Sequence, residues 1–420
     1  MTANGFTGVR EHTPTLTLDD AHTHAAAAAL HDAPVGTVGL ELEGHLVDLD
    51  RPGRRVPWPR VVDVVSGLPE PPGRSRVTLE PGGQVELSGA PSTDVVAAVT
   101  ALRRDESVLR TALAGERLGW ALLGSDPARA PRRVHPGGRY VAMEQHFAAT
   151  GQAAAGLVMM TSTCALQVNL QAGRPHQHAA RVRQAYRLGP VLIALSACSA
   201  WLGGARTGWR SARQRAWADL DARRCGPLPG GPDPAAEWAD YALRAPVMLV
   251  RDVDGPAQWP VRRAVPFARW VSGQERLGGR RPTTSDLDYH LSTLFPPTRL
   301  RGFLELRCLD AVPSRWWPGL VALVVALLDD PVAADAGAEA AEPVSGAWST
   351  AARVGLADAA LRRAAERCTE VAAAAAPPPL RRDVEAWAEL AAAGRVPGDE
   401  VDLRAASVGA LAVLAEVSRA

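Results

Sequence analysis

Several glutamates fall on short segments whose polar and apolar residues alternate. Two alternate with leucines in residues 40–46, one alternates in residues 303–309, and two stand on either side of the sequence PGGQ at 81–84. PGGQ is typical of a tight hairpin turn. Because alternate residues of a strand share one face of a sheet, these carboxylates are predicted to lie on one face. The set comprises Glu41, Glu43, Glu80, Glu86 and Glu305.

The chemistry that such a face could perform follows from its charge. Clustered carboxylates repel each other by kilocalories unless cations lie between them. Mg²⁺ prefers carboxylate oxygens and substrate phosphates, so the pattern predicts a magnesium cluster that binds nucleotide phosphates. For any single strand, a polar face exposed to water is the better explanation. The whole set argues against it, because exposed strand positions usually favour Thr, Lys and Arg. We find no convincing P-loop or dinucleotide-binding motif.

Other polar residues extend the same face. Gln167 and Asn169 alternate with apolar residues, and Arg307 follows Glu305 by two positions. The two amides are therefore predicted to share one face of their strand. Cys164 falls on the apolar side of its strand and is predicted to be a core thiol, because no Cys–His pair can be argued for it.

The elements that must position these residues alternate between strands and helices. Strands are predicted within residues 38–87, interrupted by Pro/Gly-rich loops at 51–59 and 66–75, and at 120–123, 160–171 and 303–309. Helices are predicted at 17–31, 92–118, 143–150 and 177–203 and through most of 313–420, and 236–251 is predicted as a helix that leads into a strand, whereas residues 1–15 should lack regular structure. Without a repeat or a clean linker, the simplest prediction is an α+β fold with one catalytic domain over 1–420.

Composition restricts the class of protein. The 420 residues are 47% hydrophobic, which is enough for a sizeable core, and 46 basic against 45 acidic residues leave a net charge of +1. No cationic surplus is available for nucleic acid or a membrane surface. The five cysteines are dispersed without metal-ligand spacing, no signal peptide is evident, and the apolar runs are too short to span a bilayer. We therefore expect a soluble cytoplasmic protein. Every basic residue apart from histidine is an arginine, so phosphate or carboxylate clamps must use guanidinium groups.

The same segments resemble the glutamate–cysteine ligase family, in the branch shared by plants and many bacteria. The most specific match is LEPGGQVELSGAP at 79–91. Further matches, in the family's order over roughly 38–312, are GLELE at 39–43, GRY at 138–140, MMTSTCALQVNL at 159–170, Arg213 with Trp217, HLSTLFP at 290–296, and RLR and ELR at 299–301 and 305–307. GWRS at 208–211 resembles the actinobacterial type associated with ergothioneine biosynthesis.

The resemblance implies a glutamine-synthetase-like antiparallel sheet, curved into a funnel and backed by helices. It also implies that ATP phosphorylates the γ-carboxylate of L-glutamate and that the amine of L-cysteine displaces phosphate from the γ-glutamyl phosphate. The partners would be these small molecules, not nucleic acid or membrane, and the protein would be a monomer or a small homo-oligomer.

Family roles carry over residue by residue. The resemblance implies Glu41, Glu43, Glu80, Glu86 and Glu305 as Mg²⁺ ligands, Arg307 and Glu86 as catalytic residues, and Arg213, Trp217, Gln167 and Asn169 as substrate-binding residues. The sequence departs from the family at Ser162, where plant members carry a basic residue, and nothing after Trp316 matches a family motif. Two alternatives stay open, namely a ligase of the same scaffold with another amine, and a non-catalytic amino-acid or nucleotide sensor.

Overall fold

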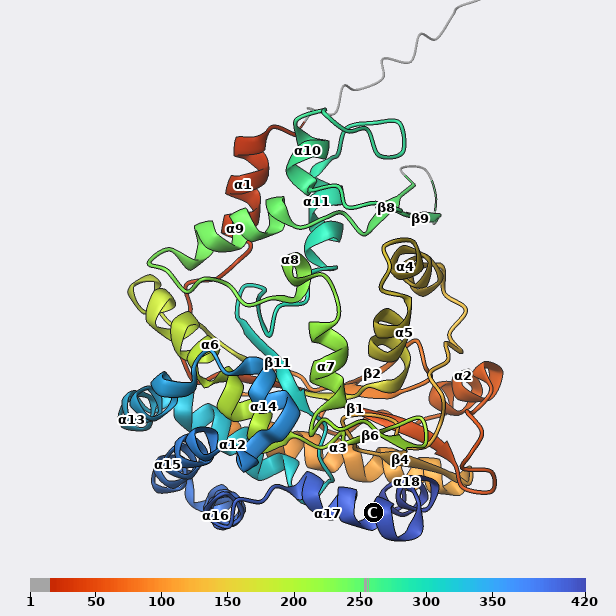
Figure 1. Ribbon diagram of the computed structural model, residues 1–420, viewed down its shortest axis with the longest axis vertical. Coiled ribbons are helices and arrows are strands. Elements are labelled where there is room, and N and C mark those ends of the chain that lie inside the picture. Colours follow the sequence, from red (N-terminus) through yellow and green to blue (C-terminus); the bar gives the residue numbers. More distant parts are fainter. Residues whose placement is uncertain (1–15, 253–254, 256) are drawn as a thin grey trace, which may run out of the picture.

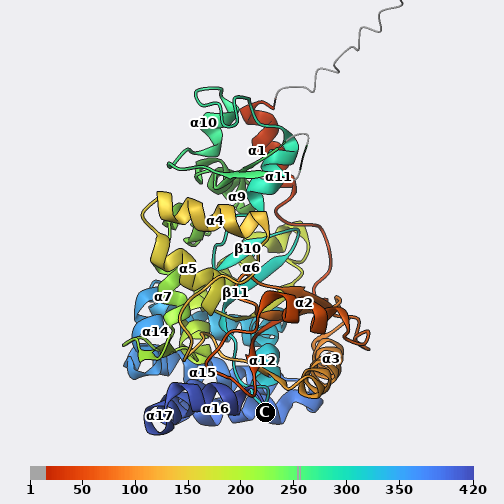
Figure 2. The same ribbon diagram turned by 90° about the vertical axis from the view of Figure 1, so that its right-hand side faces the viewer.

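The computed structural model describes residues 16–252, 255 and 257–420, so the prediction for residues 1–15 falls outside the described range. Figure 1 shows short helices and a small hairpin at the top, a twisted sheet across the middle and helices beneath it. Figure 2, turned by 90°, shows these three tiers in the same order.

The central sheet is antiparallel in every pairing and has the order β10-β11-β5-β1-β3-β2, with β4 paired to β1. Its strands are β1 (Val38–Asp48), β2 (Arg76–Leu79), β3 (Val85–Ser88), β4 (Leu118–Ala121), β5 (Ala165–Leu170), β10 (Thr298–Leu300) and β11 (Leu304–Asp310). β1 is long enough to pair with β3 and β5 along its first half and with β4 along its second. The prediction of a mainly antiparallel sheet packed by helices is confirmed.

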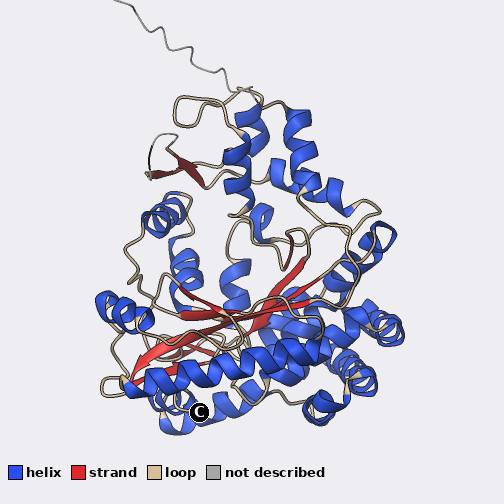
Figure 3. Cartoon of the chain, turned by 180° about the vertical axis from the view of Figure 1, so that it is seen from behind, coloured by secondary structure: helices blue, strands red, loops and turns tan. Residues whose placement is uncertain are grey.

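Helices cover the lower face of this sheet, where alternate apolar side chains such as Leu42, Leu87 and Leu166 are fully buried (Figure 3). They are α3 (Val95–Gly115), α6 (Pro175–Ser196), α12 (Trp317–Asp329), α13 (Pro331–Ala341), α14 (Trp348–Val354), α15 (Ala359–Ala375), α16 (Pro378–Ala392), α17 (Pro397–Val408) and α18 (Ala410–Val417). The apolar helix α12 is buried on all sides among them. None of the helices formed by the described residues is long and apolar enough to cross a membrane.

The upper part has an apolar core of its own, which includes Val247, Phe267, Trp270 and Leu287. Its elements are α1 (Leu18–Ala27), β8 (Leu249–Arg251), β9 (Gln258–Pro260), α9 (Pro234–Arg244), α10 (Phe267–Val271) and α11 (Thr284–Leu291). Between this part and the sheet stand α4 (Gly138–Ala149), α5 (Ala153–Ser162), α7 (Ala212–Ala218) and α8 (Ala222–Cys225), and beside the sheet lie α2 (Trp58–Ser66) and the hairpin of β6 (Trp201–Leu202) and β7 (Ala205–Arg206).

Besides residues 201–202, which were predicted as helix but form strand β6 after α6 ends at Ser196, two predicted segments have a different structure. Residues 58–66 form helix α2 where strands interrupted by loops were predicted, and the helix buries Val61. Residues 160–162 belong to helix α5, so the strand predicted at 160–171 starts only at Ala165. Side-chain hydroxyls explain the second difference, because Thr161 and Thr163 donate to carbonyl oxygens four residues earlier and complete the helical turn.

Candidate active site

The polar face of the sheet lines a cavity of about 260 Å³, here called the charged cavity. Its floor comes from β1, β3, β5 and β11, and its walls come from α4, α5, α7 and the segments 80–84 and 292–301. Every residue predicted for the site lines this cavity except Asn169, whose side chain donates to Glu41 Oε1 at 3.1 Å. Residues separated by more than 260 positions in the sequence therefore meet in one place.

Strand pairing accounts for the gathering of the carboxylates. Glu43 on β1 lies directly opposite Glu86 on β3, and Glu41 lies opposite Gln167 on β5. Directly opposite residues of an antiparallel pair project from the same face. Glu80 directly follows β2 at the start of the predicted hairpin turn, which is confirmed by the pairing of β2 with β3.

The carboxylates of Glu41, Glu43 and Glu86 accept hydrogen bonds only from neutral groups among the described residues. Glu43 accepts from the backbone N–H of Ala165 at 2.8 Å and from Gln167 Nε2 at 3.1 Å. Glu86 accepts from the Ser88 hydroxyl. Within the described residues, Glu80 makes no side-chain hydrogen bond or ion pair. No guanidinium forms an ion pair with Glu41, Glu43, Glu80 or Glu86 in that part of the chain.

Burial and mutual repulsion raise the pKa values of these carboxyl groups. Burial, followed by repulsion from Glu86 and Glu43, raises the pKa of Glu80 to about 8. Burial and neighbouring carboxylates likewise raise the pKa of Glu41 and Glu86, and burial raises that of Glu43. The four groups, which we call the carboxylate side, would become far more stable as anions with a cation between them.

Glu305 is in a different electrostatic state. It is fully buried, and Arg299 donates a hydrogen bond to each of its two carboxylate oxygens, at 2.5 and 2.9 Å. Arg307 Nη1 lies 3.2 Å from Oε2. Burial alone would raise the pKa of Glu305, but Arg299 and Arg307 lower it to about 2. We call Glu305 with these two residues the arginine side of the cavity. Arg299 was part of a matched motif, yet sequence reasoning gave it no role.

Arg307 connects the two sides. Its Nη1 also donates to Gln167 Oε1 at 2.7 Å, and the amide of Gln167 donates in turn to Glu43. The guanidinium carbon lies 5.9 Å from the centre of the Phe295 ring. A partly exposed guanidinium between carboxylates and an aromatic wall is suited to stabilise negative charge on a group within the cavity.

Arg213 lies in the first turn of helix α7 and is 2% exposed. Its Nη2 donates to the backbone oxygen of Arg307 at 2.7 Å, whereas Nη1 has no hydrogen-bond partner among the described residues. Asp310 Oδ1 lies 3.9 Å from that Nη1. Asp310 also accepts from Ser199 and Ser211 at 2.6 and 2.9 Å, which holds the start of α7 in place. A buried N–H without a partner is suited to receive a substrate carboxylate.

Sequence reasoning missed Asp310. The strand was predicted to end at Leu309, one residue before Asp310. Position 310 also falls out of phase with Glu305 and Arg307, so strand alternation did not mark it. Its signal in the sequence is weak, because an acid at the end of a strand is more often exposed.

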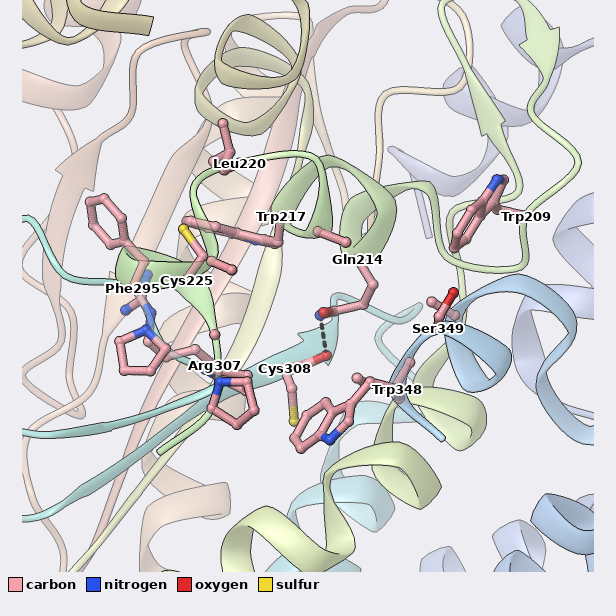
Figure 4. Close-up of a pocket in the computed structure, with 18 residues that line it drawn as sticks. Trp209, Gln214, Trp217, Leu220, Cys225, Phe295, Arg307, Cys308, Trp348 and Ser349 are labelled. Carbon is pink, nitrogen blue, oxygen red and sulfur yellow. Dashed lines mark hydrogen bonds between the residues drawn. The ribbon is translucent and has the colours of Figure 1, made fainter. Parts of the chain in front are cut away.

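A second, mostly apolar cavity of about 270 Å³ adjoins the charged one. Trp217, Phe295 and Arg307 line both. Figure 4 shows Trp217, Cys225 and Phe295 near one another, with Trp348 on the far side of the cavity. Gln214 Nε2 donates a hydrogen bond to the backbone oxygen of Cys308. Trp348 comes from α14, so the C-terminal region, which matched no family motif, contributes a wall to this cavity.

The residues of the carboxylate side fit a hard divalent cation. They supply largely buried oxygen donors that form no ion pair with an arginine among the described residues, which is the donor chemistry that Mg²⁺ prefers. No three His, Cys, Asp or Glu side chains in the described part of the chain already converge on one point. Their present donors are amides, a hydroxyl and a backbone N–H, which are weaker partners for a carboxylate than a divalent ion.

Comparison with known proteins gives consistent results. The model of the family described as glutamate-cysteine ligase family 2 (GCS2) matches residues 37–399. The chain is 51% identical to "Glutamate--cysteine ligase EgtA" of Mycolicibacterium smegmatis over 403 residues, covering 96% of this chain and 95% of that protein. It is 50% identical to the protein of the same name from Mycobacterium tuberculosis (strain CDC 1551 / Oshkosh), covering 92% of this chain and 90% of that one.

A solved structure shares the fold. It is the glutamate–cysteine ligase of Francisella tularensis in complex with AMP, with a TM-score of 0.51 and 12% identity, covering 93% of this chain and 88% of that chain. At this level of identity the likeness concerns the arrangement of helices and strands.

Proposed function

Since the chain belongs to the glutamate–cysteine ligase family, we propose that it is an ATP-dependent ligase that joins the γ-carboxyl group of L-glutamate to the amine of L-cysteine. One observation carries the proposal. The charged cavity unites carboxylates that lack a cation partner with buried arginines that can receive anionic substrates. Attack of a carboxylate on ATP needs both, because the phosphates require cations and the carboxylate requires a clamp.

The carboxylate side is the proposed place of the metal and the triphosphate. Glu41, Glu43, Glu80 and Glu86 would hold Mg²⁺, and Glu305 completes the set as the ligand nearest the arginines. Bound there, Mg²⁺ would neutralise the phosphate oxygens and orient the γ-phosphate for transfer. Glu86 has the largest part in this proposal, since it faces Glu43 across the strand pair and also repels Glu80.

The first step transfers the γ-phosphoryl group of ATP to the γ-carboxylate of glutamate. The carboxylate oxygen forms the new P–O bond, the bond to the β-phosphate oxygen breaks, and ADP leaves. Arg307 would stabilise the charge on the phosphoryl oxygens, while its bond to Gln167 fixes its direction. The guanidinium of Arg213, with its free Nη1, would bind the α-carboxylate of glutamate, and Trp217 would form a wall of that pocket.

In the second step the amine attacks the carbonyl carbon of the γ-glutamyl phosphate. The C–N bond forms, the C–O bond to phosphate breaks, and the nitrogen loses a proton. Gln167 and Asn169 would act as hydrogen-bonding groups and not as acids or bases, because amides do not titrate. Their bonds to Glu43 and Glu41 orient the carboxylates.

The pathway and location are part of the proposal. We propose that the γ-glutamylcysteine feeds ergothioneine biosynthesis in the cytoplasm. The 51% identity to a mycobacterial protein named EgtA supports the first point. The cysteines of the described chain are all free and mostly buried, which suits a reducing compartment.

The test measures phosphate release from Mg-ATP with glutamate plus cysteine, and with each amino acid alone, together with the mass of the product. Release that requires both amino acids, with γ-glutamylcysteine as product, is the expected result. Preference for another amine would reassign the protein to a related ligase of the same scaffold. ATP binding without turnover across a panel of amines would favour a sensor.

A further inference from the structure

The turn at residues 81–84, which joins Glu80 to Glu86, is held from outside by distant segments. The backbone oxygen of Pro81 accepts from the backbone N–H groups of Val134 and His135 at 2.9 and 3.0 Å. The side chain of Gln84 folds back, accepts from the Gly82 N–H at 2.8 Å and donates to the Thr163 oxygen at 3.0 Å. These bonds restrain the first and last residues of the turn.

The middle of the turn rests on helix α5 and on one arginine. A Cβ atom on Gly82 would lie 2.1 Å from the backbone oxygen of Thr161, so only glycine permits this approach. The Gly82 oxygen accepts from Arg55 Nη1 at 3.2 Å. Arg55 Nη2 also donates to Ser162 Oγ at 3.0 Å and to the Ala130 oxygen at 3.1 Å. One guanidinium therefore ties the turn to α5 and to the segment around residue 130.

The ion pair between Arg55 and Asp126 does not by itself explain why the Arg55 side chain is buried. Its side chain is 8% exposed, and its guanidinium lies 3.4 Å from Asp126, which is also buried. Asp126 already has a closer partner, because Arg129 donates to it from Nε at 2.7 Å and from its backbone N–H at 2.9 Å. The directed bonds to Gly82 and Ser162 are what Arg55 adds.

We propose that Arg55 is a positioning residue for the metal site, which fixes the turn at 81–84 and thereby the separation of Glu80 and Glu86. The inference rests on the proposed metal role of these two glutamates. Mg²⁺ demands nearly ideal geometry from its ligands, so a small displacement of either carboxylate weakens binding. Ser162 is small and leaves room for this guanidinium.

The experiment measures binding of Mn²⁺, alone and with ADP, to the full-length protein by the electron paramagnetic resonance signal of the free ion. The variants are Arg55→Met, which keeps the length of the side chain without donors, and Arg55→Lys, which keeps the charge without the fork. Arg54→Gln is the matched control, since Arg54 is exposed and its side chain makes no hydrogen bond or ion pair among the described residues. Mg²⁺ dependence of turnover, KM for cysteine and the melting temperature are measured in parallel.

We expect Arg55→Met to raise the Mn²⁺ dissociation constant by about 10-fold to 100-fold. The dissociation constant of Arg55→Lys should lie between those of Arg55→Met and the wild type, and that of Arg54→Gln should equal the wild-type value. KM for cysteine should stay unchanged while more Mg²⁺ is needed for turnover. A lower melting temperature with unchanged Mn²⁺ affinity in Arg55→Met, or in Arg55→Lys where the Met variant does not fold, overturns the inference. Absence of Mn²⁺ binding to the wild type would instead remove the proposed metal role of the glutamates.

Discussion

The two sides of the charged cavity carry the same residue type on the same kind of strand and yet differ in electrostatic state. On the carboxylate side, the residue opposite Glu43 is another carboxylate, Glu86. On the arginine side, the residue opposite Glu305 is Arg299. Burial and repulsion from Glu86 and Glu43 raise the pKa of nearby Glu80 to about 8, whereas Arg299 and Arg307 lower that of Glu305 to about 2. The charge of the neighbouring side chains, and not the residue type, decides the electrostatic state of each glutamate.

This difference separates function from stability. Repulsion on the carboxylate side disfavours the folded chain, and a cation of the proposed kind would relieve it; such stored repulsion is typical of functional sites. The paired charges of the arginine side have no such deficit. Removing one charge should therefore have opposite effects on stability at the two sides.

The largest effect is expected from Glu86→Gln. Turnover should fall by about 1,000-fold, equivalent to about 4 kcal/mol, because an amide cannot replace an anionic metal ligand. The melting temperature of the metal-free protein should stay equal or rise, since a repelling charge is gone. Steady-state kinetics and calorimetry measure the two quantities, and Glu43→Gln should lose turnover in the same way. Near-normal kcat in either variant would take that residue out of the metal set.

Glu305→Gln should instead lower the free energy of unfolding. Arg299 is buried and would lose its bidentate partner, and breaking a buried pair costs about 3–5 kcal/mol. Denaturant unfolding of the metal-free variant measures this loss. If Glu305→Gln proves as stable as Glu86→Gln, the distinction between the two sides is wrong.

Arg307→Lys tests the link between the sides. A lysine keeps the charge but lacks the planar guanidinium, so its ammonium cannot bond to Gln167 and Glu305 and still present further N–H donors to a phosphoryl group; we expect kcat to fall by about 100-fold. Arg301→Lys is the comparison, because Arg301 lies 3.6 Å from the same carboxylate but its side chain is 63% exposed. Exposed pairs contribute about 1 kcal/mol at most. Full activity in Arg307→Lys would reduce this residue to a structural ion pair with Glu305.

The smallest effect concerns pH. The pKa of Glu80 rises from 4.5 to about 8 on folding, so its contribution to stability is complete below about pH 4.5 and is lost as the pH rises through 8. For Glu305 the sign is reversed, and its contribution is present above about pH 4.5 and is lost as the pH falls towards 2.

In metal-free protein, the melting temperature of Glu80→Gln should therefore decline less than that of the wild type between about pH 5 and pH 8. Equal slopes for the two proteins in that window would show that Glu80 is already ionised. Glu305→Gln should leave the slope in this window unchanged.

Much of the site could be predicted because strand alternation has a strict period. Leucines at 40 and 42 place Glu41 and Glu43 on the opposite face wherever the strand lies, and PGGQ brings Glu80 and Glu86 to one turn. Alternation could not identify Arg55 or Asp310, since one lies in a loop and the other acts through contacts with residues about 100 positions away. The assignment of residues 1–420 to one catalytic domain stays a prediction.

The sequence by itself determined the polar face of the sheet, its five glutamates, the antiparallel fold class and the family, because these depend on local period and on ordered motifs. Only the tertiary structure decided which glutamates have an arginine partner, which cavity Arg213 faces, and that α14 completes an apolar pocket beside it. The physical reason is that burial and Coulomb energy depend on distances between segments remote in sequence, and the register that sets those distances leaves no local trace.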